Sequence, residues 1–289
     1  MEAALARMAL FSLSSLPRGA ALRLGGFYAR LLDLGIPRLR RTGLINLGFA
    51  YPERDARWRE ATLDGVFRSI GRMLAVFARF PQITRGNVSD WIRYEGFEHF
   101  EQAKRRGKGV LFATAHLGNW ELSAFSHALM AEPMAVIVRP LDNPVIDGIV
   151  QKRRSLSGNT LLSKRDFARS ILEALRRNQA VGILVDHNSA PEGAAFVPFF
   201  GLPACSNMTF AKLAFRSGAA VIPGFAVWNE AEKRYILRFC AEVKMEGDPA
   251  LDTACIQAAL EAAVRQYPDQ WLWIHRRWKT RPDGEPPIY

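Results

Sequence analysis

The chain has 289 residues and a formal net charge of +11, and 49% of its residues are hydrophobic. This length suits one large α/β domain or two small ones, and the ordinary apolar content excludes a disordered protein. The cysteines, Cys205, Cys240 and Cys255, are odd in number and too widely spaced for a zinc site. We therefore expect reduced structural thiols in a cytosolic setting, and no bound metal.

The basic charge is concentrated at the two ends of the chain. Residues 1–50 hold seven arginines against two acids. Residues 271–281 hold no acid and four basic residues, which are Arg276, Arg277, Lys279 and Arg281. Such patches suit partners that carry negative charge, such as nucleic acid, anionic lipid headgroups or an acidic carrier protein. Three tryptophans, Trp271, Trp273 and Trp278, are interleaved with the second patch, and they either mark a membrane–water boundary or pack this segment onto the core.

The N-terminal segment has the pattern of a membrane-surface helix. The apolar run at residues 8–16 is shorter than the roughly 20 apolar residues that a spanning helix needs. Leucine, phenylalanine and tyrosine then alternate with arginine as far as Leu34, which favours an amphipathic segment lying on a bilayer. We divide the chain into residues 1–41, a basic amphipathic membrane-association segment, and residues 42–289, a single folded domain.

After residue 45, strands are predicted to alternate with helices. This alternation indicates one α/β domain with a mixed, mostly parallel sheet flanked by helices. The predicted strands span residues 91–95, 109–115, 134–138, 160–163, 180–185, 220–228 and 234–243. The predicted helices span residues 58–80, 97–106, 119–131, 143–157, 166–178, 207–217 and 251–266. Residues 186–206 are rich in Gly, Pro and Phe and are predicted to form a loop, and long loops inside compact domains are often functional.

Residues 113–121 contain the candidate catalytic pair, His116 and Glu121, where an apolar strand ends and a helix begins. Asn119 is a good N-cap for that helix, so His116 should lie in the turn and Glu121 in the first helical turn. The carboxylate of Glu121 would then reach one imidazole nitrogen and leave the other free to take a proton from a hydroxyl. A His and a Glu at this spacing also occur by chance, so the pattern alone does not establish catalysis.

Six blocks along the chain, taken in order, resemble the bacterial lipid A biosynthesis acyltransferases, the late lauroyl and myristoyl transferases of the glycerolipid acyltransferase superfamily. The blocks are residues 46–53, residues 116–121, residues 139–144, residues 185–204, residues 219–223 and residues 267–279. The chain departs from the family pattern at His187, where the family usually has Gln, and at Cys205 and Ser206, where a Thr-bearing step is common. These departures leave the acceptor and the acyl chain length open.

The resemblance implies a glycerolipid-acyltransferase-like fold and transfer of a fatty acyl chain from acyl carrier protein to a hydroxyl of an anionic lipid A precursor, without a cofactor. It implies that His116 is the general base and that Glu121 orients it. The side chains expected to contact substrate are Asn119, Arg139, Asp186, Arg276 and Arg277, the arginines because their fork suits phosphate and carboxylate groups. Asp186 either contributes to the site or caps its loop. The expected location is the cytoplasmic face of the inner membrane, by peripheral or N-terminal attachment.

Two other functions stay open from the sequence. An acyltransferase acting on a lysophospholipid, a mannosylated lipid or an aminolipid would keep every motif, and coenzyme A could replace the carrier protein as donor. A nucleic-acid-binding protein would account for the basic patches, but no RNA-recognition signature is present and the His–Glu pair would have no role. We therefore expect no nucleic-acid partner.

Overall fold

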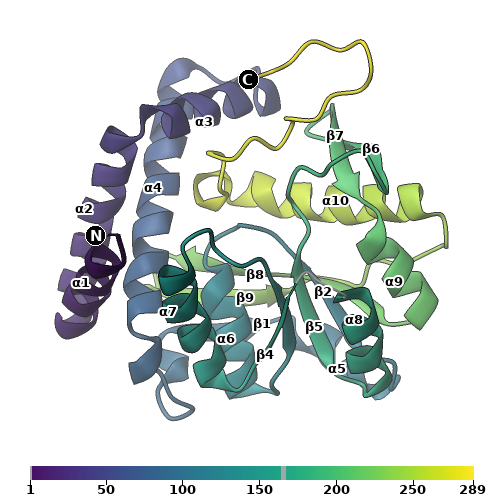
Figure 1. Cartoon of the computed structure of the whole chain (residues 1–289), viewed down its shortest axis with the longest axis horizontal. Helices are drawn as coiled ribbons and strands as arrows, with labels where there is room; N and C mark the ends of the chain where they lie inside the picture. Colours follow the sequence, from purple (N-terminus) through teal and green to yellow (C-terminus); the bar gives the residue numbers. More distant parts are fainter. Residues whose placement is uncertain (1, 164–166) are drawn as a thin grey trace.

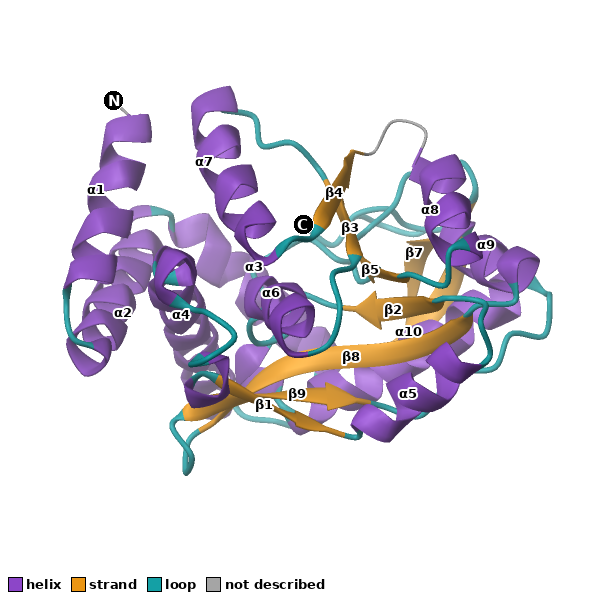
Figure 2. Ribbon diagram, turned by 90° about the horizontal axis from the view of Figure 1, so that it is seen from below, coloured by secondary structure: helices purple, strands orange, loops and turns teal. Residues whose placement is uncertain are grey.

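A seven-stranded sheet organises the chain, with the strand order β1-β9-β8-β2-β5-β3-β4 (Figure 1, Figure 2). The structure is a computed structural model that describes residues 2–163 and 167–289. The strands are β1 (Ile92–Glu95), β2 (Val110–Thr114), β3 (Ala135–Val138), β4 (Thr160–Ser163), β5 (Ala180–Leu184), β8 (Ala220–Asn229) and β9 (Arg234–Phe239). Neighbouring strands are parallel except β8 and β9, which are antiparallel. The predicted mixed, mostly parallel sheet is thus confirmed.

Helices cover both faces of this sheet (Figure 2). After residue 50 the helices are α4 (Ala56–Ala78), α5 (Phe97–Arg105), α6 (Trp120–Met130), α7 (Pro144–Arg154), α8 (Phe167–Arg176), α9 (Thr209–Ser217) and α10 (Pro249–Gln266). Of these, α7 lies away from the sheet and contacts the N-terminal helix α1 (Glu2–Ser15). Each helix from α4 to α10 follows a predicted helix closely, although residue 166, the first of one predicted helix, lies outside the described residues.

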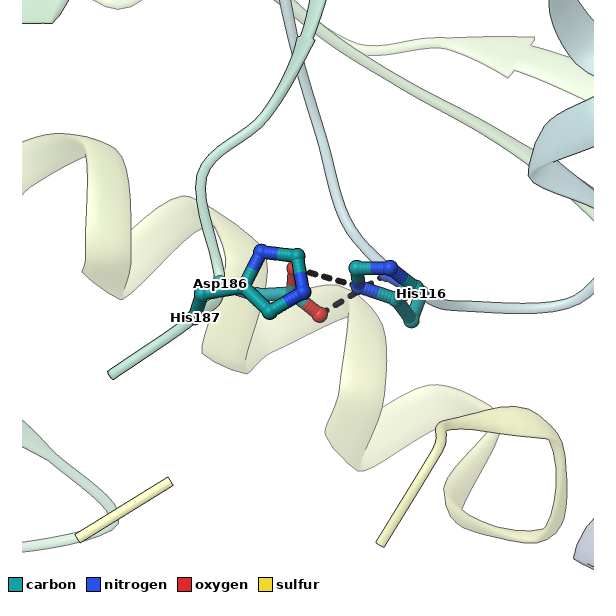
Figure 3. A group of neighbouring side chains, drawn as sticks. All are labelled: His116, Asp186 and His187. Carbon is teal, nitrogen blue, oxygen red and sulfur yellow. Dashed lines mark hydrogen bonds and ion pairs between the residues drawn. The ribbon is translucent and has the colours of Figure 1, made fainter. Parts of the chain in front are cut away.

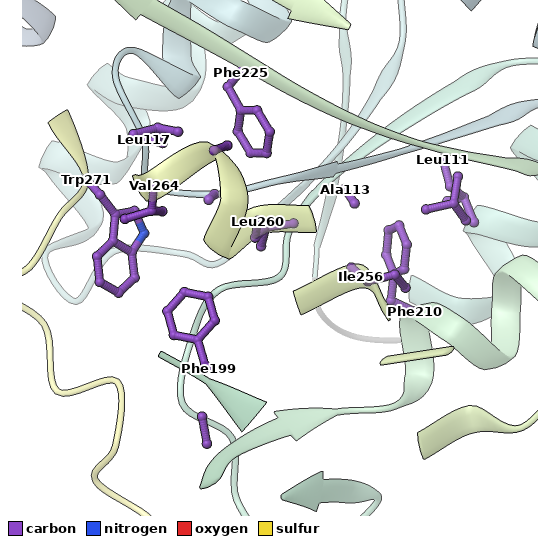
Figure 4. Packing of buried hydrophobic residues seen from close by; sticks show 14 of the residues in the cluster. Leu111, Ala113, Leu117, Phe199, Phe210, Phe225, Ile256, Leu260, Val264 and Trp271 are labelled. Atoms are coloured by element: carbon purple, nitrogen blue, oxygen red, sulfur yellow. The ribbon is translucent and has the colours of Figure 1, made fainter. Parts of the chain in front are cut away.

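The two faces are built from alternate residues of the strands, because successive side chains of a strand point to opposite sides. In β2, Leu111 and Ala113 belong to a cluster of buried hydrophobic residues with side chains of α8, α9 and α10. Figure 4 shows part of this cluster. Val110 and Phe112 pack on the other side with α5 and α6. Both sets are buried, which is typical of a parallel strand covered on both faces.

The predicted loop at residues 186–206 is wrong over its second half. Residues 194–207 form an antiparallel hairpin of β6 (Ala194–Phe199) and β7 (Leu202–Asn207). Its turn residues, Phe200 and Gly201, both have positive φ, as a tight hairpin turn requires. Pro198 and Pro203, which face each other in the hairpin, concealed the strands in the sequence because proline is disfavoured in a sheet interior.

The N-terminal residues form three helices, α1 (Glu2–Ser15), α2 (Arg18–Gly35) and α3 (Pro37–Ala50), beside α4 (Figure 1). The helices α2 and α4 touch at their backbones, because a Cβ on Gly25 would lie 2.3 Å from the carbonyl oxygen of Gly71. The division of the chain predicted between residues 41 and 42 falls within α3. Among residues 2–163 and 167–289, no helix is both long enough and apolar enough to cross a bilayer.

The side chain of His127, on α6, is a buried ionisable group outside the predicted site. It is 2% exposed among phenylalanine rings, and its Nδ1 lies 3.3 Å from the hydroxyl of Tyr94. Burial, helped by the charge of Lys104, lowers the pKa of His127 to about 3. The imidazole is therefore neutral in the folded protein near neutral pH.

We expect His127 to make the folded state less stable as the solution becomes acidic. The unfolded imidazole has a pKa of about 6.5, so between pH 6.5 and 3 the unfolded state binds more protons than the folded state. The free energy of unfolding is then highest above pH 6.5 and falls by up to about 1.4 kcal/mol per pH unit below it. Changing His127→Gln should flatten the decrease of Tm between pH 7 and pH 5, whereas His99→Gln should not. An unchanged slope in His127→Gln would show that this group does not carry the effect.

Candidate active site

Two parallel strands bring His116 and Asp186 together, although 70 residues separate them. In the pairing of β2 with β5, Thr114 lies opposite Leu184. His116 and Asp186 each follow two residues later, so both lie at the same edge of the sheet. Nδ1 of His116 lies 2.9 Å from Oδ1 of Asp186, and the backbone N–H of His116 donates to Oδ2 at 2.8 Å (Figure 3). One carboxylate thus fixes both the main chain and the ring of His116.

The Asp186 carboxylate is fully buried, and a third donor completes its shell. The indole N–H of Trp271 donates to Oδ2 at 2.9 Å. Burial opposes ionisation of Asp186, but the charge and hydrogen bond of His116 outweigh it and hold the pKa of the carboxyl well below its usual range. Because an ionised carboxylate only accepts hydrogen bonds, Nδ1 of His116 carries the hydrogen, and in the neutral imidazole Nε2 carries the free lone pair.

The turn that holds His116 is fixed from two sides. Gly118 has a φ of +65°, and a Cβ there would lie 2.0 Å from the carbonyl oxygen of Ala226 on β8, so only glycine fits. The Gly118 N–H donates to the carbonyl of Gln270, and the N–H of Leu272 donates to the carbonyl of His116. The turn therefore lies between β8 and the C-terminal segment.

Glu121 has a different partner from the one predicted. It lies in the first turn of α6, as expected, but its carboxylate accepts from Nε of Arg154 at 2.8 Å and from Nη2 at 2.5 Å. Within the described residues, the Nδ1 hydrogen bond of His116 goes to Asp186. The expected contact between Glu121 and the imidazole is corrected accordingly, because Asp186 occupies that nitrogen and Arg154, at the end of α7, holds Glu121.

The other predicted site residues divide into buried and exposed groups. Asn119 is fully buried and caps α6, as predicted, by accepting from the N–H of Leu122 at 2.9 Å. Arg139 is exposed just beyond β3, at the edge of the sheet where β2 and β5 also end. Arg276 is exposed as well. These two arginines remain available to a ligand.

Arg277, predicted to contact substrate, points into the protein and is fully buried. Its guanidinium donates to the carbonyls of His187 and Cys205, to the hydroxyl of Ser206 and to the amide oxygen of Gln257. Burial lowers its pKa to about 10. A docking role does not fit this residue, which joins the C-terminal segment to the core instead.

The three tryptophans of the C-terminal segment are fully buried. Of the two predicted alternatives, they pack this segment onto the core and do not mark a membrane–water boundary. Their sequence spacing gave no indication that Trp271 would hydrogen-bond Asp186. His275 was also not identified, although its ring centroid lies 6.4 Å from that of His116. His187, noted only because it departs from the family pattern, has its ring centroid 4.2 Å from that of His116.

Comparison with known proteins identifies the family. The family model for bacterial lipid A biosynthesis acyltransferases matches residues 3–280. The lipid A biosynthesis lauroyltransferase of Escherichia coli K12 is 29% identical, over 97% of this chain and 92% of the relative. The palmitoleoyltransferase of the same organism is 31% identical, over 90% and 86%. A lipid A biosynthesis acyltransferase of Haemophilus influenzae is 25% identical, over 85% and 77%. The chain therefore belongs to the bacterial lipid A biosynthesis acyltransferase family and is an acyltransferase.

Proposed function

We propose that the chain transfers a fatty acyl group from acyl carrier protein to a hydroxyl of a lipid A precursor, with His116 as the general base. The observation that carries this proposal is the hydrogen bond between the buried Asp186 carboxylate and Nδ1 of His116, at the carboxyl edge of the sheet in a member of this family. Relatives named for lauroyl and palmitoleoyl transfer in lipid A biosynthesis favour this acceptor over the other lipids considered.

In the proposed reaction, Nε2 of His116 takes the proton from the acceptor hydroxyl as its oxygen attacks the thioester carbonyl. The C–O bond forms, the C–S bond breaks, and the imidazolium returns the proton to the departing thiolate. Asp186 stabilises the imidazolium through Nδ1, and general-base catalysis of this kind typically contributes about 10²–10⁴-fold to the rate. No acyl-enzyme is needed, because the thioester is already activated.

Glu121 enters the proposal as a positioning residue that acts through Arg154. The two side chains are only 13% and 21% exposed, so their ion pair is shielded from water and joins the first turn of α6 to the last turn of α7. Losing one partner would leave the other charge largely buried without its pair, which is costly. The pair thereby fixes the helix whose N-terminus adjoins the His116 turn.

Anionic groups of both substrates would meet a basic surface. Arg139 and Arg276 are exposed and suit the phosphates of a lipid A precursor or the acidic surface of the carrier protein. A cavity of about 880 Å³ between α2, α3 and α4 is lined by apolar side chains, four arginines and two aspartates, Asp33 and Asp64. Of these, Arg41 and Arg68 form no ion pair with the described residues, so they suit a phosphate-bearing lipid.

We also propose that α1 and α2 attach the enzyme to the surface of the inner membrane. Leu10 and Leu13 of α1 are buried, whereas Leu5, Met8 and Phe11 are 55%, 62% and 73% exposed. On α2, large apolar side chains are also exposed, namely Phe27, Leu31, Leu32 and Leu34. An exposed apolar face accompanied by arginine is typical of a helix that lies in the interface of an anionic bilayer.

Replacing His116→Ala or Asp186→Asn should each reduce acyl transfer by at least about 10²-fold, because the first removes the base and the second removes the acceptor that fixes its tautomer. The measurement is turnover of purified protein with acyl carrier protein thioester and lipid A precursor. Near-normal turnover of His116→Ala would refute the proposed base.

The variant Glu121→Gln provides the comparison for a positioning role. If Glu121 acts only through Arg154, Glu121→Gln and Arg154→Gln should lose similar activity, and the double variant should lose no more than either one. The pH profile of the residual activity should stay that of the wild type. A profile displaced in Glu121→Gln but not in Arg154→Gln would instead indicate direct action on His116.

Replacing Met8 and Phe11 with serine should weaken binding to vesicles that contain anionic lipid. Burying such a side chain is worth roughly 1.5–3 kcal/mol, so each change should cost about tenfold or more in affinity. The matched control is Phe215→Ser on α9, a phenylalanine that is 56% exposed but lies far along the chain from this face. Equal losses in the control and the test variant, measured by vesicle sedimentation, would exclude α1 as the attachment surface.

A further inference from the structure

Three imidazoles gather around the carboxyl edge of the sheet. The ring centroid of His187 lies 4.2 Å from that of His116, and the centroid of His275 lies 6.4 Å from His116 and 6.1 Å from His187. Figure 3 shows the His187 ring beside the Asp186 carboxylate that faces His116. Potential metal-binding atoms of His116, Asp186 and His187 all lie within 4.8 Å of one another. The proposed acyl transfer uses neither His187 nor His275.

The tautomers of two of these rings leave nitrogen lone pairs available. Nδ1 of His116 donates to Asp186, and Nδ1 of His275 lies 2.6 Å from the carbonyl oxygen of Leu272. Because both partners only accept, each Nδ1 carries its hydrogen and each Nε2 carries a lone pair. Nε2 of His275 is buried and has no hydrogen-bond partner among the described residues. Histidines that bind metals commonly have this arrangement, with the second ring nitrogen donating to a carboxylate or a carbonyl.

We propose that His116, His187 and His275 form a binding site for a divalent cation of the zinc class. Imidazole nitrogen suits zinc, cobalt, nickel and copper, whereas magnesium and calcium prefer oxygen. Asp186 would remain a hydrogen-bond partner of His116, because its two oxygens already accept three N–H groups. Water would fill the remaining coordination positions.

The three rings must move to hold one ion. Two nitrogens bound to zinc at 2.0–2.1 Å in tetrahedral geometry are about 3.3 Å apart. The ring centroid of His275 lies 6.4 Å from that of His116 and 6.1 Å from that of His187, so binding requires the rings to approach one another. His187 is exposed and supplies this movement by rotation of its side chain. The cysteine spacing predicts no metal site, whereas the proposed site uses histidines that the fold brings together from three separate segments.

A cation in this site is an inhibitor, not a cofactor. It would occupy Nε2 of His116, the atom that the proposed reaction needs as a base, so this consequence rests on the proposed function. Binding of the cation does not depend on the proposed function. The two statements can therefore be tested separately on the same protein.

Binding is measured on the full-length protein after treatment with a chelator, by titration with Co²⁺ and observation of its visible d–d absorption, followed by displacement with Zn²⁺. We expect one ion per chain and strong absorption from a nitrogen-rich, low-coordinate site. His187→Gln should weaken Co²⁺ binding by at least about tenfold, and His99→Gln, in a histidine outside the cluster, should leave it unchanged. No Co²⁺ absorption in the wild type, or equal affinity in His187→Gln, would overturn the site.

Inhibition is measured with the same stock of protein. Zn²⁺ should abolish acyl transfer with a midpoint that matches its measured affinity, a chelator should restore the activity, and Mg²⁺ should have no such effect. Full activity of the Zn²⁺-loaded enzyme would contradict the base role of His116 while leaving the metal site intact. Absence of binding would remove the metal site while leaving the base role untouched.

Discussion

A single buried carboxylate holds the site together. Asp186 is fully buried, and burying an ionised group without partners costs several kcal/mol. Three N–H donors offset this cost, two from His116 and one from Trp271. The donors come from the turn after β2 and from the C-terminal segment, which lie 70 and 85 residues from Asp186 along the chain. Hydrogen bonding to this one carboxylate therefore brings three distant segments together. The position of His116 follows from these hydrogen bonds.

The C-terminal segment extends this arrangement to the rest of the molecule. Arg277 donates to four acceptors around the hairpin of β6 and β7 and on α10, and Asn46 of α3 donates to the carbonyls of Trp273 and His275. The N-terminal helices, the hairpin and the turn that holds His116 are therefore linked through the C-terminal segment. This explains why a sequence that looks like an exposed basic run is largely internal, with Arg276 facing solvent and Arg277 facing the core.

The sequence predicted what depends on local pattern. The strand before His116, the N-cap at Asn119 and the order of strands and helices all follow from periodicity and capping, which short segments encode by themselves. The partner of His116 could not be predicted in this way, because it depends on β2 and β5 being neighbours. Proximity in the sequence favours Glu121, five residues from His116, whereas Asp186 is predicted at a strand end without any indication that it contacts the histidine. The pairing of Trp271 with Asp186 is likewise a product of tertiary packing.

We propose that Asp186 keeps the hydrogen on Nδ1 of His116 and thereby leaves Nε2 free to act as a base. Nitrogen NMR of protein labelled at histidine tests it most directly, with the His116 signals assigned from the spectrum of His116→Gln. In the neutral imidazole we expect a protonated Nδ1 and an unprotonated Nε2, with that preference lost in Asp186→Asn. A hydrogen on Nε2 in the wild type, or the same tautomer in Asp186→Asn, would contradict it.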